Sequence, residues 1–101
     1  MKRPRVLFRP TARSDLKNIY RYILEQSQDR RAASSYTDRI YARCLAIADT
    51  PFGGADRSRW QPGMRMVPFE RSVLIVYMIE ANAIQIVRVV HGRRDVDRMM
   101  Q

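Results

Sequence analysis

The chain has 101 residues, which is enough for one domain and too few for two. Hydrophobic residues make up 46% and charged residues 29%, a balance that predicts a globular protein and excludes a disordered or collagen-like chain. The 19 lysines and arginines outnumber the 10 acidic residues, so the net charge is +9 and an anionic partner is expected. Arginine dominates the basic residues. A genome rich in G and C would also favour arginine over lysine, but it would not explain the excess over acids.

Cysteine and histidine are too scarce for a disulfide or a zinc site. Cys44 and His91 are single residues of their types, so we expect no internal disulfide, no metal and no cofactor. The apolar stretch behind the basic amino terminus, residues 6–8, is too short for a signal peptide. The longest apolar run, residues 73–79, is much shorter than the ~20 residues of a membrane span. We therefore expect a soluble, cytoplasmic protein without a membrane segment.

The chain begins with a predicted strand and a predicted helix. Residues 6–8 are apolar and are bounded by Pro10, which favours a short buried strand. From Ala12 onward the apolar residues recur at helical spacing, which predicts a helix over residues 10–26. Pro10 suits the first turn of this helix, whereas Arg9 is a poor N-cap.

A second helix is predicted after the short polar break at residues 27–29. Apolar residues again recur at intervals of three or four from Ala33. The helix is expected to end near Asp49, because Pro51 disfavours helical geometry in the residue before it. So short a connection predicts that the two helices lie side by side as an antiparallel hairpin.

The second half of the chain predicts a meander of three strands. After a loop at 51–63 that is rich in Gly, Pro and Arg, strand-length segments cover 64–69, 72–80 and 83–91, with two residues between neighbours. The middle segment has no polar alternation, as expected of a central strand that is covered on both faces. Pro68 places the first segment at an edge or a bulge.

These elements predict a single α+β domain over residues 1–101, in the order strand, helix, helix, three strands. The helical hairpin is expected to pack on one face of a small, mainly antiparallel sheet. The other face of the sheet would then carry an apolar central strand. Since such a face is not left in water, we expect a tail, a second copy or a partner to cover it.

The end of the last predicted strand carries the residues best suited to bind an anion. The candidate binding residues are Arg65, Arg88, His91, Arg93, Arg94 and Trp60. The arginines would converge near one end of the meander and form a site for phosphate or carboxylate. In the alternative interpretation, Asp95 and Asp97 pair with the arginines and His91 only bonds the loop.

These residues give little indication of catalysis or of an aromatic side chain that stacks on nucleic-acid bases. His91 has no evident nucleophile in its motif, so we expect no catalytic residue. Trp60 lies in the Gly/Pro loop among arginines. It is either an exposed contact or a plug at the edge of the core.

Several short motifs along the chain occur in the same order in a known protein family. They include Arg9-Pro10-Thr11-Ala12, Pro51-Phe52-Gly53, Gly63-Met64-Arg65, Val76-Tyr77 and the closing Arg88-Val89-Val90-His91-Gly92-Arg93-Arg94-Asp95. Their order and spacing resemble the RelE/ParE superfamily of bacterial toxins from type II toxin–antitoxin modules, and its ParE branch in particular. The closing string is the most specific. Arg9 departs from the Ser or Thr that is usual in the family, which affects only the helix cap.

The resemblance implies one of two activities. RelE-like members cut messenger RNA on the ribosome, and their functional positions match Arg65, Val67, Leu74, Arg94 and Met100 here. Because only two of these five are cationic, the groups that would stabilise a phosphorane and move protons are mostly missing. The comparison favours the ParE branch, whose members resemble inhibitors of DNA gyrase that act by binding and perform no reaction.

The resemblance also implies a partner, a ParD-like antitoxin whose carboxyl-terminal segment folds on the toxin in a hetero-oligomer. A surface of charge +9 and an apolar sheet face suit an acidic, amphipathic segment. We expect this segment to contact the exposed sides of the two helices and the open sheet face. Arg65, Arg88 and Arg94 would pair with its acidic residues.

Two other functions stay open at this point. One is a RelE-like, ribosome-dependent mRNA endoribonuclease whose candidate groups are His91, Arg65 and Arg94. The other is a small basic nucleic-acid-binding domain, for which the charge is suitable. Because the chain shows no helix-turn-helix, RNP or finger pattern, we do not expect it to bind nucleic acid alone.

Overall fold

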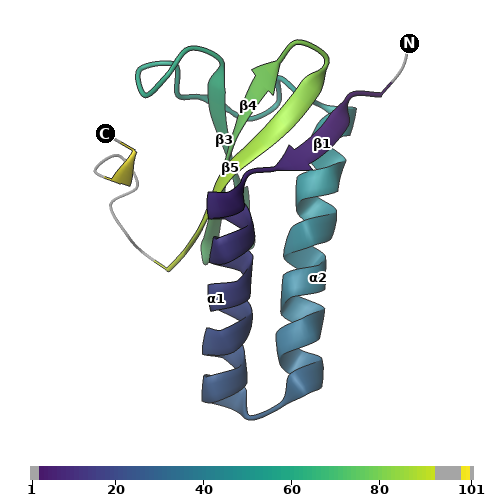
Figure 1. The fold of residues 1–101 in the computed structure, drawn as a ribbon, viewed down its shortest axis with the longest axis vertical. Coiled ribbons are helices and arrows are strands. Elements are labelled where there is room, and N and C mark those ends of the chain that lie inside the picture. Colours follow the sequence, from purple (N-terminus) through teal and green to yellow (C-terminus); the bar gives the residue numbers. More distant parts are fainter. Residues whose placement is uncertain (1–2, 93–98, 101) are drawn as a thin grey trace.

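The computed structural model describes residues 3–92 and 99–100 and has the predicted order of elements (Figure 1). The elements are β1 (Arg5–Phe8), α1 (Pro10–Ser27), α2 (Arg30–Ala46), the 3-10 turn η1 (Ile47–Asp49), β2 (Ala55–Asp56), β3 (Met64–Phe69), β4 (Val73–Glu80) and β5 (Ala83–His91). The second predicted helix thus reaches Asp49, but its last turn is a 3-10 turn. The two-residue strand β2 lies inside the segment that was predicted as a loop.

The sheet has five strands in the order β1-β5-β4-β3-β2. Strand β1 is parallel to β5, and the other neighbours are antiparallel. The sheet is therefore mainly antiparallel with β4 at its centre, as predicted. Pro68 lies at the edge, because β2 pairs only with Arg65 and Met66 of β3, so no neighbouring strand needs the N–H that proline lacks.

The two helices begin differently. At α1, Arg9 is the N-cap and its side chain makes no capping bond, while Pro10 occupies the first turn, as predicted. At α2, the Asp29 side chain accepts hydrogen bonds from the backbone N–H groups of Arg31 and Ala32, which satisfies donors that the helix itself leaves unpaired. Gln28 adopts a left-handed conformation between the helices, with φ 53°, and reverses the chain.

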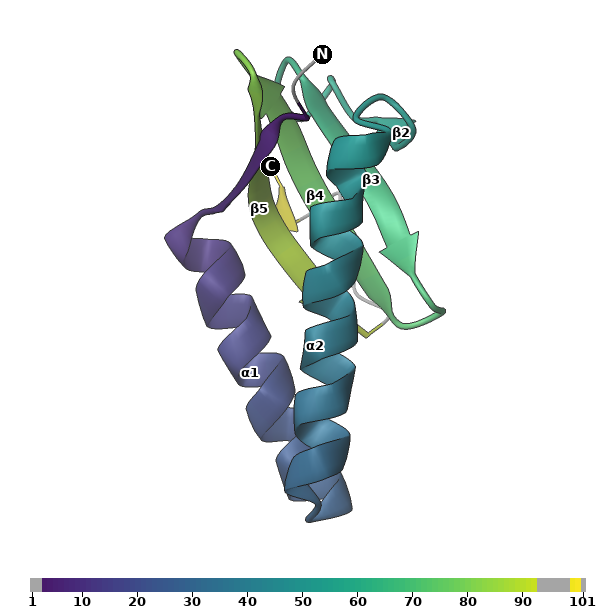
Figure 2. The same cartoon turned by 90° about the vertical axis from the view of Figure 1, so that its right-hand side faces the viewer.

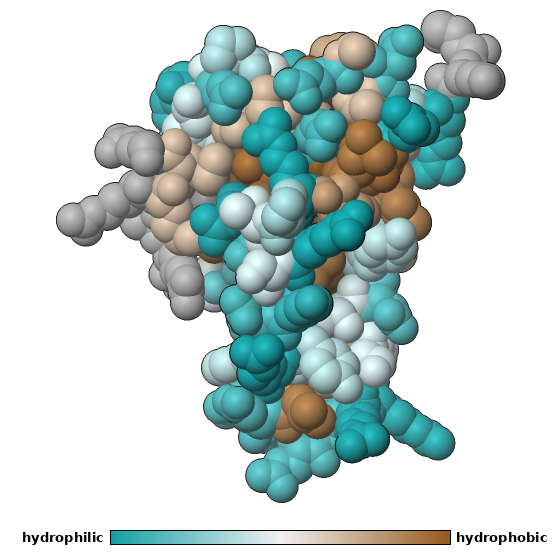
Figure 3. Space-filling view, viewed as in Figure 1, coloured by the Kyte–Doolittle hydropathy of each residue, from teal (hydrophilic) through white to brown (hydrophobic). Residues whose placement is uncertain are grey.

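The antiparallel helical hairpin packs on one face of the sheet, and its turn projects beyond the sheet (Figure 2). The contact buries apolar side chains from both layers, including Ala12, Ile19, Ile40, Cys44, Ile75, Tyr77, Ile84 and Ile86. Hydrophilic residues cover most of the outer side of the hairpin, whereas apolar surface gathers around β1 and the end of α2 (Figure 3). The hairpin is thus amphipathic, as its helical periodicity predicts.

The opposite face of the sheet has a small core of its own. Met64, Val76, Met78 and Val87 are buried there. Trp60 from the loop and Met100 from the carboxyl-terminal segment pack against this cluster. The expectation that something covers this face is confirmed, with a tail and a loop residue as its cover. Trp60 packs half-buried on this core, and the guanidinium carbons of Arg57 and Arg59 lie 5.7 and 5.4 Å from the centre of its ring.

Candidate functional site

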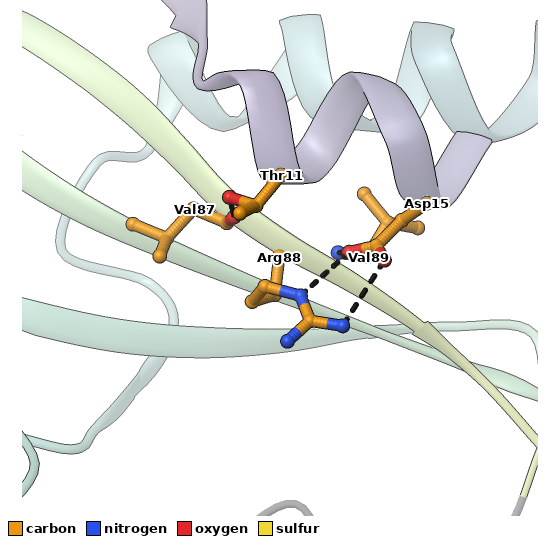
Figure 4. Close-up of polar contacts among 5 residues, drawn as sticks. All are labelled: Thr11, Asp15, Val87, Arg88 and Val89. Atoms are coloured by element: carbon orange, nitrogen blue, oxygen red, sulfur yellow. Dashed lines mark hydrogen bonds and ion pairs between the residues drawn. The ribbon is translucent and has the colours of Figure 1, made fainter. Parts of the chain in front are cut away.

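Side chains of helix α1 bond the backbone of β5 beyond the point where β1 ends. Strand β1 pairs with β5 only as far as Ile86. Beyond this point, the Thr11 hydroxyl donates to the Val87 carbonyl at 2.7 Å, and the Asp15 carboxylate accepts from the Val89 N–H at 2.9 Å (Figure 4). Since Thr11 and Asp15 are four residues apart, they lie on one face of the helix. Two side chains thus replace the backbone partners that a longer β1 would have supplied.

Asp15 also holds Arg88 in a bidentate pair. Arg88 Nε and Nη2 donate to the two carboxylate oxygens at 2.8 and 3.1 Å (Figure 4). The side chains are 27% and 14% exposed, so the pair is shielded from water. The hydrogen bonds from Arg88 to Asp15 raise the pKa of the guanidinium, and the arginine stays charged. The bulge opposite Val76 and Tyr77 breaks the regular register of β5 just before Arg88, and bulges commonly redirect side chains.

A groove of about 370 Å³ lies beside this pair, between α1 and the end of β5. Its lining includes Asn18, Tyr22, Arg88 and His91. The imidazole of His91 meets the ring of Tyr22 edge-on, with 5.3 Å between centroids, and the ring of Tyr36 with 6.0 Å. His91 is thus held between two phenol rings. The groove offers binding surface, with an arginine that is already paired; its described lining contains no serine or cysteine.

Arg65 has a different set of partners. Its Nη1 donates to the backbone carbonyls of Phe52 and Gly54 at 3.0 and 2.7 Å, and its guanidinium carbon lies 5.2 Å from the centre of the Phe52 ring. Arg65 therefore belongs to the loop beside β2, whereas Arg88 belongs to α1 beyond β5. Arg65 and Arg88 lie opposite the neighbouring residues Tyr77 and Val76 of β4, one on each side of that strand. Each guanidinium has its own partners, and a common anion site stays a prediction. Their strands were identified, but their partners were not.

The remaining predicted contacts at the end of β5 fall outside the described residues. They are Arg93, Arg94, Asp95 and Asp97. Sequence reasoning missed Thr11 and Asp15, and it missed the partners of Tyr77. The polar pair at i and i+4 on α1 was a usable signal, because both residues interrupt the side of the helix next to its apolar stripe.

The part of the chain that the structure describes contains no group of three or more His, Cys, Asp or Glu side chains arranged to hold a metal ion. None of its helices is long and apolar enough to cross a membrane.

The family model for the ParE toxin of the type II toxin–antitoxin system parDE matches residues 6–96. The match covers β1 from Val6 onward, both helices and the other strands of the sheet. The chain belongs to the ParE toxin family. A search among curated proteins finds no match to this ParE chain.

A solved structure has the same fold as this ParE toxin. It is described as the chromosomal ParDE toxin–antitoxin system from P. aeruginosa. The TM-score is 0.77, at 21% sequence identity, over 90% of this chain and 98% of that one. At this identity the similarity establishes the shared fold. It agrees with the predicted strand, helical hairpin and meander.

In this ParE chain, most of the residues at the positions that match the functional residues of RelE-like toxins are packed or bonded within the fold. Val67 is buried in the core between the hairpin and the sheet. Met100 packs on the second cluster across the sheet, and Leu74 is half-buried. Arg65 is bound to carbonyl groups of its own chain. The four described positions thus present one cation, with its guanidinium already engaged.

Proposed function

We propose that this ParE toxin arrests growth by binding DNA gyrase in the cytoplasm, without performing a reaction, and that a ParD-like antitoxin neutralises it. The observation that carries the proposal is the match of residues 6–96 to the ParE toxin family. The side chains at the RelE-like positions support it, because Val67, Leu74 and Met100 have no proton to transfer and cannot stabilise a charged phosphorane.

The proposed antitoxin is an acidic chain that orders on the toxin. The net charge of +9 favours an acidic partner, and electrostatic complementarity accelerates association. The aromatic side chains Tyr22 and Tyr41 are 49% and 47% exposed, although Tyr22 meets His91 of β5 and Tyr41 stacks on Phe8 of β1. They suit apolar contacts of an amphipathic segment. Arg88 can contribute through Nη1, since Nε and Nη2 bond Asp15.

Purified toxin added to a gyrase supercoiling reaction tests this function. We expect supercoiling to be inhibited and cleaved DNA to accumulate in proportion to the toxin. Toxin that has been mixed beforehand with the antitoxin encoded beside it is the matched control, and it should leave gyrase active. The same toxin in a translation reaction should leave the messenger RNA intact.

The cellular counterpart is induction of the toxin gene with and without its antitoxin neighbour. DNA-damage signalling upon induction is the expected outcome. Unchanged gyrase turnover together with cleavage of ribosome-bound transcripts would contradict the proposal and favour the ribonuclease. DNA binding without gyrase that falls steeply with added salt would favour the nucleic-acid-binding alternative.

A further inference from the structure

The loop at residues 50–54 is held by side chains of the sheet. Tyr77, which is buried on β4, donates its hydroxyl proton to the Pro51 carbonyl at 2.7 Å and accepts from the Gly54 N–H at 3.1 Å. Arg65 bonds the next carbonyls, those of Phe52 and Gly54. The Gly53 N–H closes the turn on the Thr50 carbonyl at 2.9 Å. Most of the backbone polar groups of this loop are thus bonded, which restricts its conformations.

This rigid loop presents a large aromatic side chain to solvent. Phe52 is 70% exposed, the highest value among the large hydrophobic residues that the structure describes. Exposing a phenylalanine has no benefit for folding, since burial of its ring would stabilise the protein. A partner that binds Phe52 would have little loop entropy to remove, because Tyr77 and Arg65 have already ordered the backbone. Preordered aromatic residues of this kind frequently dominate the binding energy of protein interfaces.

Two hollows flank the Phe52 ring. The larger one, of about 1040 Å³, lies between the start of β1 and the turn from β4 to β5, and Pro51, Ile79 and Ile84 contribute to its apolar lining. The smaller one, of about 300 Å³, lies on the side of Arg65 and Met64. Phe52 lines both. The ring therefore protrudes between two depressions, so an apolar side chain of an extended or helical segment can contact it from either side.

The charges around the hollows favour an acidic occupant. Arg3 and Arg5 line the larger hollow, and Arg65 lines the smaller one. The carboxylates in the same linings are those of Asp49 and Asp56. Asp49 is 3.3 Å from Arg3, and Asp56 accepts from the Ser58 N–H at 2.7 Å. Since Arg3 and Asp49 neutralise each other, the three arginines and two carboxylates of these linings leave an excess of one positive charge.

We propose that Phe52 and its two hollows form a docking surface for an acidic protein segment that places an apolar side chain against the ring. The proposal rests on the proposed function for its partner, because in a ParE toxin the acidic segment is that of the antitoxin. It adds a surface at the end of the sheet to the helix sides that were expected from the sequence. The sheet face that was expected to be open carries Trp60 and Met100. Arg65 acts here as a positioning residue that holds the ring.

The test measures the affinity of the full-length toxin for the purified antitoxin encoded beside it, together with gyrase inhibition by the same samples. Phe52→Ala should weaken antitoxin binding about tenfold or more, as truncation of an interface hot spot does, and should leave gyrase inhibition unchanged. Phe52→Leu is the matched control and should bind within about threefold of wild type, because it keeps an apolar side chain of similar volume. Arg5→Gln should reduce the salt dependence of the affinity.

The outcomes separate this inference from the function on which it rests. If wild-type toxin fails to bind the antitoxin, both the proposed function and this surface are wrong. If wild-type toxin binds and Phe52→Ala binds equally well, the proposed function stands and the docking surface is wrong. If Phe52→Ala keeps its antitoxin affinity but no longer inhibits gyrase, the surface belongs to the target, which also overturns the proposal. Because Phe52 is exposed, its substitution should leave the melting temperature of the free toxin unchanged.

Discussion

Arg88 in β5 and Arg65 in β3, the two strands that flank the central strand β4, bind their partners by different chemistry. Arg88 binds a carboxylate, that of Asp15, and ties the end of β5 to α1. Arg65 binds neutral acceptors, the carbonyls of Phe52 and Gly54, and ties the loop at residues 50–54 to β3. The first contact joins two charges in a partly buried place. The second orders a loop and leaves an aromatic ring in water.

The comparison shows that part of the arginine excess serves the fold. Arg3 and Arg39 also pair within the chain, with Asp49 and Glu70. An anionic partner was expected from the composition, but these guanidinium groups already bind carboxylates of their own chain. The two sides of the sheet should therefore respond differently to substitution, salt and pH.

The largest expected effect is on the loop side. In Gly54→Ala the new Cβ would lie 2.6 Å from the Tyr77 hydroxyl oxygen and 3.0 Å from the Met66 carbonyl oxygen, so the loop or the strand must shift. We expect a loss of about 3 kcal/mol in the free energy of unfolding, as for other overpacked sites. Urea denaturation followed by circular dichroism measures it.

Gly53→Ala is the matched control for this substitution. Its Cβ would meet the Thr50 carbonyl oxygen at 3.2 Å, which a small movement of an exposed loop can relieve. We expect a loss of about 1 kcal/mol or less. Equal losses for both alanines would show that Tyr77 does not constrain the loop.

A smaller loss is expected on the helix side. Asp15→Ala leaves Arg88 and the Val89 N–H without their shared acceptor, which should reduce the free energy of unfolding by about 2 kcal/mol. Asp15→Asn keeps an acceptor but removes the charge, so it should lose less. The measurement is the denaturation midpoint at low and at high salt.

Salt distinguishes the two sides. Salt screens charges, so the difference between wild type and Asp15→Ala should shrink as salt is added. The loss in Gly54→Ala arises from packing and should stay constant. A loss in Asp15→Ala that is independent of salt would mean that the hydrogen bond to Val89 matters more than the charge pair.

The smallest expected effect concerns Tyr77 and alkaline pH. Tyr77→Phe removes the bonds to Pro51 and Gly54 and should reduce the free energy of unfolding by about 1 kcal/mol at neutral pH. Burial raises the pKa of Tyr77 above its ordinary 10.0. Stability is therefore fully present below pH 10 and falls above it, where the unfolded chain loses its phenolic proton first.

Wild type should thus lose stability above pH 10 more steeply than Tyr77→Phe. Burial raises the pKa of Cys44 from 9.0 to about 12, so the thiol adds a loss between these values in both proteins. That common loss cancels when the two denaturation curves are compared. Parallel curves from pH 9 to 11 would show that the Tyr77 phenol contributes nothing to the alkaline response.

Elements with strong local patterns were predictable from the sequence. The helices follow from apolar spacing, and their antiparallel arrangement follows from the short break at residues 27–29. The central position of β4 follows from its unbroken apolar run, and the edge position of Pro68 follows from its missing N–H. Trp60 was left open between an exposed contact and a plug. It is half-buried and packs against the second cluster across the sheet, and its role as a contact stays a prediction.

The contacts that define the candidate site were not predictable, because they join residues that are far apart in the chain. Arg88 and Asp15 are separated by 73 positions, and no local pattern selects one carboxylate among the ten. The bulge in β5 shifts the register by one residue, which decides where each side chain points. Strand β2 has two residues, too few to show a period. Tyr77 belongs to the segment that was predicted as a central strand covered on both faces, which agrees with its burial. Its two backbone bonds depend on the loop.

The parallel pairing of β1 with β5 affects how the toxin is made. The first strand of the chain finds its neighbour only when residues 83–86 have been synthesised. A nascent chain therefore carries its helical hairpin before the sheet beneath it exists, and pairing of such distant segments is slow. The complete sheet, and every contact that depends on it, therefore forms after the helical hairpin.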